Sequence, residues 1–317
     1  MTHAMVVDAD GAVHAMDRDA ALAAAGPLIW VHLDRDHADT LAWLKGRAHL
    51  PDAAIDALTA TETRPRCEAV GDGALVNLRG LSPDTASMSD PFASVRIYAR
   101  GCRVISVARL PMNSIDAVCA EVQAGEIKDA GDLIAAFADA ITAELDPVVV
   151  DLGDELDDCE EGIDQHRLFA LRRAVGRARA RAIGYRRFLA PQRDALERLA
   201  ALPADWLAED DRLHLAAAAD RAARMAEELE AIRERAALLH ETLTDLRAEQ
   251  IDQRALVISI VAMVFLPLTF LTGLLGMNVE GIPYAREPWA FWGVVGICVI
   301  LAVAIAVYFA RRHWFRD

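Results

Sequence analysis

Small and weakly polar residues recur at steps of seven between Glu241 and Gly276. Residues seven apart share one face of a supercoiled helix, so the repeat predicts two adjacent seams. Both seams begin with acidic residues and continue with small or weakly polar ones. Several copies of such a helix around an axis would line a pore, with the carboxylates drawing cations to its mouth. One seam holds Glu241, Ala248, Ala255, Ala262, Thr269 and Gly276, and the other holds Asp245, Asp252, Ser259, Leu266 and Gly273.

Neutral oxygen atoms are the ligands that this segment offers to an ion. Ser259, Thr269, Thr272 and Asn278 supply hydroxyl or amide oxygens, which would bind a hydrated divalent ion weakly enough to release it. Residues 255–275 include no His, Cys, Asp, Glu or Lys. This argues against tight zinc binding within the segment and against a proton relay of the usual kind. Close packing between helices explains the small residues equally well, so both interpretations stay open.

Two uncharged segments are long enough to cross a membrane. They comprise residues 255–275 and 289–310, which are 21 and 22 residues. As helices they would be about 31 to 33 Å long, against a hydrocarbon core of about 30 Å. Basic residues flank the pair at 247, 254, 311, 312 and 316. By the positive-inside rule both termini lie in the cytoplasm, and the opening residues contain no apolar run typical of a secretory signal.

Charge and cysteine content narrow the class of protein. The formal net charge is −15, and only four arginines and three acidic residues occur from Ala255 onward. The preceding part is therefore strongly acidic, which disfavours nucleic acid as a partner and is compatible with cations. The five cysteines form no CxxC pair, so the sequence predicts neither a zinc finger nor a dithiol redox site.

The predicted secondary structure changes along the chain from strands and helices to helices alone. Short β-favouring runs and intervening helical patterns predict a sheet flanked by helices in the first part. From about Asp132 the pattern is helical, with a break predicted by Pro191 and Pro203. From about Asp205 a helix could continue to Leu275, about 105 Å, and would need partner helices. The β-favouring runs are 4–7, 28–33, 74–78, 94–98 and 103–107, and the helical patterns are 39–48 and 53–59.

Two other groups carry residues that could bind metal. The segment HLDRDH offers His32, Asp34, Asp36 and His37, but a strand that leads into a loop is expected to place them apart on the surface. Eight acidic residues lie within 151–164 and an arginine-rich run follows. We expect these to be solvated helix faces joined by ion pairs, with a cation-sensing tip as the alternative.

The segment MVFLPLTFLTGLLGMNVEGIP, followed by a second apolar segment and a basic tail, resembles the CorA superfamily of divalent cation transporters. The Gly-Met-Asn signature of that superfamily stands here as Gly276, Met277 and Asn278. More narrowly the chain is similar to the zinc-transporting ZntB branch. The segments that carry this similarity are TETRPRC at 61–67, RRFLAPQRDALERLA at 186–200, VFLPLTFLTGL at 264–274 and GIP at 281–283.

The resemblance implies a homopentamer in the bacterial inner membrane, with membrane lipid and divalent cations as its other partners. Asn278 would then be the selectivity residue at the outer mouth, and Gly276 and Met277 would shape the turn that presents it. Zinc uptake is implied, with cadmium, nickel and cobalt as further ions and with coupling to protons. No cofactor is expected beyond the transported cation, and no nucleic acid.

The expected architecture is an α+β membrane fold with a funnel like that of CorA. We predict a cytoplasmic α/β domain at 1–130 and a cytoplasmic helical hairpin and stalk at 131–254. The first, pore-lining transmembrane helix would be 255–275 and the second 289–310. The extracytoplasmic loop with the signature would be 276–288, and the cytoplasmic basic tail 311–317.

Two departures from the ZntB pattern leave the metal open. The middle residue of the signature remains Met277, and Glu280 stands where a glycine pair is usual before Ile-Pro. An acid at this place is more typical of the magnesium-transporting relatives. The alternatives are therefore a magnesium or cobalt channel without proton coupling and, from another class, a membrane-anchored coiled-coil sensor without transport. No nucleophile with a base, phosphate-binding loop or catalytic acid pair stands out, so an enzyme is not expected.

Overall fold

The structure is a computed structural model that describes residues 2–61, 64–83, 91–164, 167–277, 282, 284 and 287–311. The chain divides into two compact units, Met1–Glu241 and Thr242–Asp317. The helix α7 (Glu209–Leu275) contributes residues to both units. Two residues of predicted importance, Asn278 and Glu280, lie outside the described residues.

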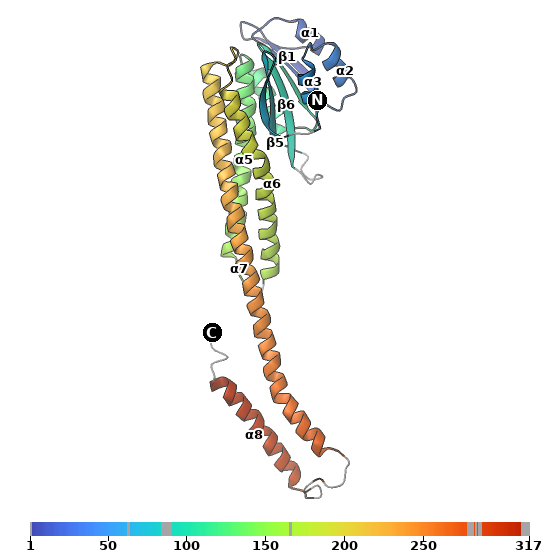
Figure 1. Cartoon of the computed structure of the whole chain (residues 1–317), viewed down its shortest axis with the longest axis vertical. Coiled ribbons are helices and arrows are strands. Elements are labelled where there is room, and N and C mark those ends of the chain that lie inside the picture. The colour runs from blue at the N-terminus through green and yellow to red at the C-terminus, as the bar shows by residue number, and fades with distance from the viewer. Residues whose placement is uncertain are drawn as a thin grey trace. The chain divides into compact units, whose positions relative to one another are not determined.

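A seven-stranded sheet lies at the centre of the first unit (Figure 1). Its order is β2-β1-β3-β7-β6-β5-β4, and the pair β3 with β7 is parallel while the other neighbouring pairs are antiparallel. The five predicted strands are confirmed, whereas β2 and β4 were not predicted. The strands are β1 (His3–Val7), β2 (Val13–Ala15), β3 (Leu28–Asp34), β4 (Arg66–Val70), β5 (Gly73–Leu81), β6 (Phe92–Arg100) and β7 (Arg103–Ala108).

Helices cover both faces of this sheet, which explains why β5 and β6 are buried along almost their whole length. The short helices α1 (Arg18–Ala23), α2 (Thr40–Gly46) and α3 (Asp52–Thr59) form one layer. Alternate residues of β3 divide between the faces. Ile29, Val31 and Leu33 join the core with α2 and α3, whereas the Trp30 ring meets the Phe137 ring edge-on on the opposite face. That face carries α4 (Asn113–Ala124), α5 (Ala130–Glu161) and α6 (Leu168–Ala200).

The helices α5, α6 and the first part of α7 form a coiled coil in the first unit (Figure 1). Their buried residues recur at alternating steps of three and four, the spacing of a left-handed supercoil. Ion pairs join α7 to both partners, from Arg235 to Asp157 and Glu160 on α5 and from Arg186 on α6 to Glu230. On α7 of the first unit the buried apolar positions are Leu215, Ala218, Ala219, Ala222, Met225, Leu229, Ile232, Ala236 and Leu239.

Two predicted helix boundaries were wrong. The helix α6 continues through Pro191 to Ala200, although proline removes one backbone hydrogen bond. Buried neighbours such as Leu189 and Leu196 anchor this stretch to the coiled coil, and their packing outweighs that loss. The break instead follows Ala200, and α7 begins at Glu209 rather than near Asp205.

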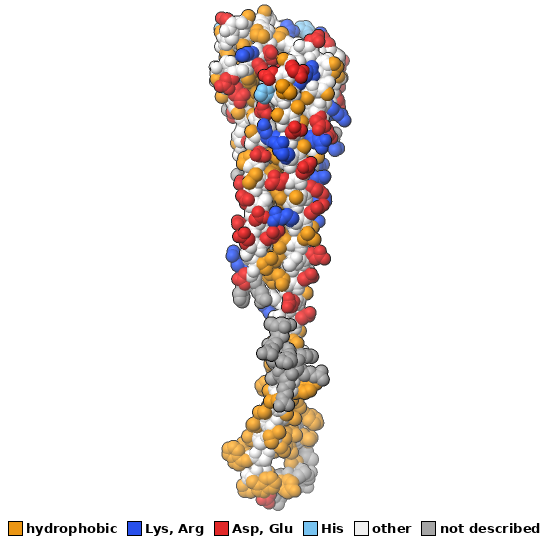
Figure 2. Space-filling view, turned by 90° about the vertical axis from the view of Figure 1, so that its left-hand side faces the viewer, with side chains coloured by type: hydrophobic (Ala, Val, Ile, Leu, Met, Phe, Trp, Pro, Cys, Tyr) orange, Lys and Arg blue, Asp and Glu red, His pale blue; other side chains and the backbone are white. Residues whose placement is uncertain are grey.

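The second unit exposes a predominantly apolar surface within the single chain (Figure 2). It contains the end of α7 and the helix α8 (Ala290–Arg311). Phe265, Leu266 and Phe270 on α7 are more than 60% exposed, as are Phe291 and Trp292 on α8. Apolar surface of this extent is stable only against lipid or further protein.

Candidate functional site

The residues of the two predicted seams are all exposed within the chain. Glu241 and Asp245 are each two residues from the buried Leu243, a turn of about 200° around a helix, and both side chains are exposed. The seam residues that follow are exposed within the chain as well. These are Asp252, Ser259, Thr269 and Gly276, together with Thr272 and Met277.

Each hydroxyl on this face donates its proton to the backbone of its own helix. Ser259 Oγ lies 2.8 Å from the carbonyl oxygen of Ala255, and Thr269 Oγ1 lies 2.7 Å from that of Phe265. Thr272 Oγ1 likewise donates to Leu268 at 2.9 Å. With the proton used in this way, each oxygen keeps a lone pair that can accept a bond from a water molecule or contact a cation.

The end of α7 is a turn that favours glycine. The Gly276 N–H donates to the carbonyl of Thr272 at 2.9 Å. A Cβ atom at Gly276 would lie 3.0 Å from that same carbonyl oxygen, a tight contact. The helix thus ends directly before the described chain reaches Met277, whose side chain is exposed. The roles assigned to Asn278 and Glu280 stay predictions, because both fall outside the described residues.

The prediction that the HLDRDH segment places its residues apart on the surface was wrong for His32. This side chain is only 3% exposed, and its Nδ1 is 2.8 Å from the buried Ser106 Oγ. Burial lowers the pKa of His32 to about 3, with His3 acting in the same direction. Asp36 and His37 are exposed, and Asp36 forms an ion pair with Arg109.

The expected ion pairs of the acidic run are confirmed in part. Glu155 on α5 pairs with Arg181 on α6, with both carboxylate oxygens 2.8 Å from Nη1. Asp157 and Glu160 bond Arg235 on α7. The acids of α5 thus serve to hold the coiled coil together, although exposed pairs of this kind contribute only about 1 kcal/mol or less each.

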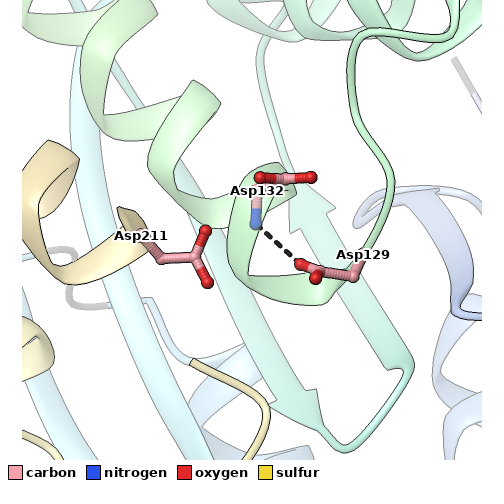
Figure 3. Close-up of side chains that lie close together, drawn as sticks. All are labelled: Asp129, Asp132 and Asp211. Atoms are coloured by element: carbon pink, nitrogen blue, oxygen red, sulfur yellow. Dashed lines mark hydrogen bonds between the residues drawn. The ribbon is translucent and has the colours of Figure 1, made fainter. Parts of the chain in front are cut away.

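Three carboxylates meet where α5 and α7 begin (Figure 3). Single oxygens of Asp129, Asp132 and Asp211 lie within 4.8 Å of one another. Each carboxylate already accepts backbone N–H groups at a helix start. Asp129 accepts from Gly131 and Asp132, Asp132 from Lys128, and Asp211 from Ala208. Capping of the two helices explains this cluster without a metal ion.

Among the described residues, α7 and α8 are long and apolar enough to cross a membrane by length and composition. The apolar window of each helix has no buried residues within the chain. An α/β unit, a coiled coil and two exposed apolar helices are together the features expected of a membrane protein with two spans.

Comparisons with known proteins show the family to which this chain belongs. Residues 26–312 match the family described as CorA-like Mg2+ transporter protein. The chain is 31% identical over 309 residues to the zinc transport protein ZntB of Yersinia enterocolitica, covering 97% of this chain and 94% of that protein. It is 34% identical over 300 residues to the divalent cation transporter CmaX of Pseudomonas aeruginosa, covering 90% and 87%.

Solved structures agree with the family match. Full-length CmaX has a TM-score of 0.80 at 32% identity and covers 98% of this chain and 97% of its own. The CorA magnesium transporter of Methanocaldococcus jannaschii, with a TM-score of 0.77 at 17% identity, covers 99% and 98% and shares the fold. The chain belongs to the CorA family and is a divalent cation transporter of the CorA superfamily, not an enzyme. The hypothesis of an anchored sensor without transport is thereby disfavoured.

Proposed function

We propose that the protein takes up zinc through a pore lined by several copies of α7. The exposed face of α7 carries the proposal, because its seams place carboxylates before hydroxyl oxygens whose protons are already bonded to the helix. Carboxylates at Glu241, Asp245 and Asp252 would concentrate cations. The hydroxyls would replace part of the hydration shell without holding the ion tightly.

Zinc is proposed because relatives about 31% identical over nearly the whole chain are named zinc transport proteins. Cadmium, nickel and cobalt would follow zinc through the same neutral oxygens. No residue of the described spans offers a carboxylate or imidazole for a proton relay. Coupling to protons, if present, would therefore act outside the membrane-spanning part of α7 and α8.

The assembly proposed with this function is a homopentamer in the bacterial inner membrane with both termini in the cytoplasm. The first unit would then comprise a cytoplasmic α/β domain at 1–130 and a helical hairpin and stalk from 131 onward. Exposed apolar side chains on α7 and α8 would contact lipid or neighbouring copies. The segment 276–288 would form the outer mouth, where Asn278 amides would meet the incoming hydrated cation.

A flux measurement tests metal and coupling together. The full chain is reconstituted in proteoliposomes with a zinc-sensitive dye inside, and zinc entry is recorded with and without an imposed pH gradient. The same vesicles are then tested with a magnesium-sensitive dye. Zinc entry that exceeds magnesium entry supports the proposal, and a rate that follows the pH gradient supports coupling. Vesicles that admit no divalent ion contradict it.

Replacement of Asn278 tests the outer mouth. Asn278→Ala should abolish zinc flux or broaden its selectivity, because the amide oxygens that would meet the ion are lost. Size-exclusion chromatography in detergent should show unchanged assembly. Unaltered flux and selectivity in a normally assembled variant would refute the role assigned to Asn278.

A magnesium or cobalt channel without proton coupling is the second candidate. Two observations favour it: the matching family is described as CorA-like Mg2+ transporters, and Glu280 follows the signature by two residues. A carboxylate near the mouth suits a strongly hydrated hard cation. Under this alternative, Glu280→Gly should reduce magnesium entry more than zinc entry, and a pH gradient should change neither.

A further inference from the structure

Five arginines gather on the sheet face that α2 and α3 cover. One row across the sheet contains two of them. Arg66 of β4 is the register partner of Asn77 of β5, and Asn77 is in turn the partner of Arg96 of β6. The partner of Arg96 on β7 is Val107, which belongs to the core with α2 and α3. Direct partners across a sheet point to the same face, so Arg66 and Arg96 both lie on this one.

The next row on the same face contains the other three arginines. Arg79 of β5 is the partner of Ser94 of β6, two residues along from the first row. Arg35 and Arg109 directly follow β3 and β7, and the Arg35 N–H donates to the Ala108 carbonyl oxygen at 2.8 Å, which continues the parallel pairing. Residues two apart along a strand are separated by about 7 Å. The five side chains therefore begin close together on one surface.

Arg96 is buried within this arginine cluster, which comprises Arg35, Arg66, Arg79, Arg96 and Arg109. It is only 2% exposed, and among the described residues neither its Nε nor its Nη1 has a hydrogen-bond partner. Burial lowers the pKa of Arg96 to about 10, and the charges of the other four arginines act in the same direction. A buried guanidinium surrounded by positive charge is unfavourable unless a negatively charged acceptor meets its donors.

The arginines around Arg96 keep donors for a further acceptor. Arg109 Nε lies 3.3 Å from an oxygen of Asp36, and Arg66 Nε lies 3.7 Å from an oxygen of Glu68. Arg35 Nε donates to a backbone carbonyl oxygen at the end of α3, 3.1 Å away. These contacts use one nitrogen of each guanidinium, which has five N–H donors in all. In a chain with a formal net charge of −15, the arginine cluster is thus a local surface of the opposite sign.

We propose that the arginine cluster binds a phosphate-type oxyanion, with Arg96 at the base of the site and the exposed Arg66 and Arg109 at its rim. Guanidinium groups suit phosphate because each can donate two parallel N–H bonds to its oxygens. Arg35 would supply a further donor, and Arg79, which stacks on an aromatic ring of α6, adds positive charge. The site attracts anions, whereas the seams of α7 attract cations. The proposal therefore does not depend on which cation the protein conducts.

Calorimetric titration tests for such an anion. The full chain in detergent, freed of divalent cations, is titrated with inorganic phosphate, with ATP and with mixed micelles that contain phosphatidic acid, all at constant ionic strength in chloride. At least one of them should bind at about one phosphate-bearing ligand per chain. The tightest of the three identifies the source of the phosphate as a free ion, a nucleotide or a lipid. Failure of all three to bind would overturn the proposal.

Substitutions on β6 locate the binding. Arg96→Met removes the base of the site and should weaken binding by about tenfold or more. Arg100→Gln is the matched control, because Arg100 is an exposed arginine of the same strand that pairs with Asp72 at 2.6 Å. It lies about 13 Å along the strand from Arg96, beyond the Debye length of about 10 Å. Arg100→Gln should therefore bind as the wild type does, and equal affinity in the wild type and Arg96→Met would contradict the site.

Thermal unfolding provides a second readout. In phosphate-free buffer Arg96→Met should unfold at a higher temperature than the wild type, because it removes a buried charge without an acceptor. The tightest-binding anion should raise the midpoint of the wild type and of Arg100→Gln but not of Arg96→Met.

A double variant, Arg66→Gln with Arg109→Gln, tests the rim independently of the buried arginine. Both side chains are exposed, so circular dichroism should show the native fold. Loss of two donor groups should weaken anion binding by about tenfold. Unchanged affinity in this folded variant would overturn the proposal.

Discussion

Hydroxyl groups on α7 are bonded to the backbone of their own helix, and under the proposed function they would meet a passing ion in that state. Thr269 donates its proton to Phe265, so the side chain holds one rotamer and exposes oxygen lone pairs. The same arrangement occurs at Ser259 and Thr272. A hydroxyl that must first break a bond would respond more slowly. Because the hydroxyl proton is bonded to the backbone, the oxygen can offer a lone pair to an ion while that hydrogen bond stays intact.

Removal of one hydroxyl should therefore slow conduction without disturbing the helix. Thr269→Val should reduce divalent flux in proteoliposomes by about tenfold, the effect of about 1.4 kcal/mol on a barrier. Thr269→Ser restores the oxygen and should restore most of the flux. Equal flux in the Val and Ser variants would show that Thr269 only packs against neighbouring helices.

Glycine at position 131 is required by a close approach between two helix ends. A Cβ atom there would lie 1.9 Å from Asp211 Oδ2. Gly131→Ala should lower the free energy of unfolding by about 1 to 3 kcal/mol, as overpacking does. Gly176→Ala is the control, because nothing lies within 4 Å of a Cβ atom at that exposed site in α6. It should instead stabilise the protein by about 0.5 to 1 kcal/mol, and thermal unfolding in detergent compares the two.

At this scale the sequence predicts sets of residues that follow a helical period and misses contacts that do not. The seams through Ser259 and Thr269 needed only the period of one helix. The meeting of His3 with Cys119 depends on a strand register and on the packing of α4, over 116 residues of separation. The one available signal was His32 in the β-favouring run 28–33, and nothing in one sequence sets its register against the strand that carries His3.

At the scale of elements, the starts of α5 and α7 share one cluster of carboxylates (Figure 3). Burial raises the pKa of Asp211 from 3.8 to about 6; the hydrogen bond from Ala208 opposes this shift, and the charges of Asp129 and Asp132 add to it. The folded protein therefore binds this proton more tightly than the unfolded chain. The stability that it contributes is present at low pH and is lost as the pH rises through about 6.

Asp211→Asn should remove this pH dependence and keep the capping bond, since the amide oxygen still accepts from Ala208. Between about pH 5 and about pH 7.5, the thermal midpoint of the wild type should fall relative to that of the variant. The contribution of His32 to stability depends on pH in the opposite direction, because burial lowers the pKa of His32 in the folded protein from 6.5 to about 3. This contribution is lost as the pH falls from about 6.5 toward about 3. That contribution is common to both proteins and cancels. Parallel curves would contradict the assignment to Asp211.

The elements themselves were predicted from the sequence wherever their pattern was long. Five strands (β1, β3, β5, β6 and β7) and the helical region followed from alternation and composition. The three-residue β2 is too short for a pattern, and β4 has only one buried side chain, Cys67. The break predicted at Pro191 was wrong because the preference of proline against helix interiors is local. In α6, packing along a helix of 33 residues outweighs it.

At the scale of the molecule, the two units have surfaces suited to different solvents (Figure 2). The first unit buries its apolar residues in one sheet core and one coiled coil. The second exposes apolar side chains along α7 and α8. Fragments of the chain should therefore differ in solubility according to the apolar residues that they leave exposed.

A fragment of residues 1–241 should be monodisperse in buffer without detergent, since it retains the buried face of α7 from Leu215 to Leu239. A fragment of residues 1–208 lacks that face and exposes the apolar seam of α5 and α6. It should aggregate or require detergent, as size-exclusion chromatography and light scattering would show. Equal solubility of the two would mean that α7 contributes little to the coiled coil.

The one parallel strand pair also sets an order of events during folding. The strands β4 to β7 pair with their neighbours in chain order, so their contacts join residues that are close in sequence. The pairing of β3 with β7 instead joins His32 to Ser106 across 74 residues, and such contacts form late because their loop-closure entropy is larger. The meander β4 to β7 would therefore be the nucleus, and the edge that carries β1 would be the last to dock.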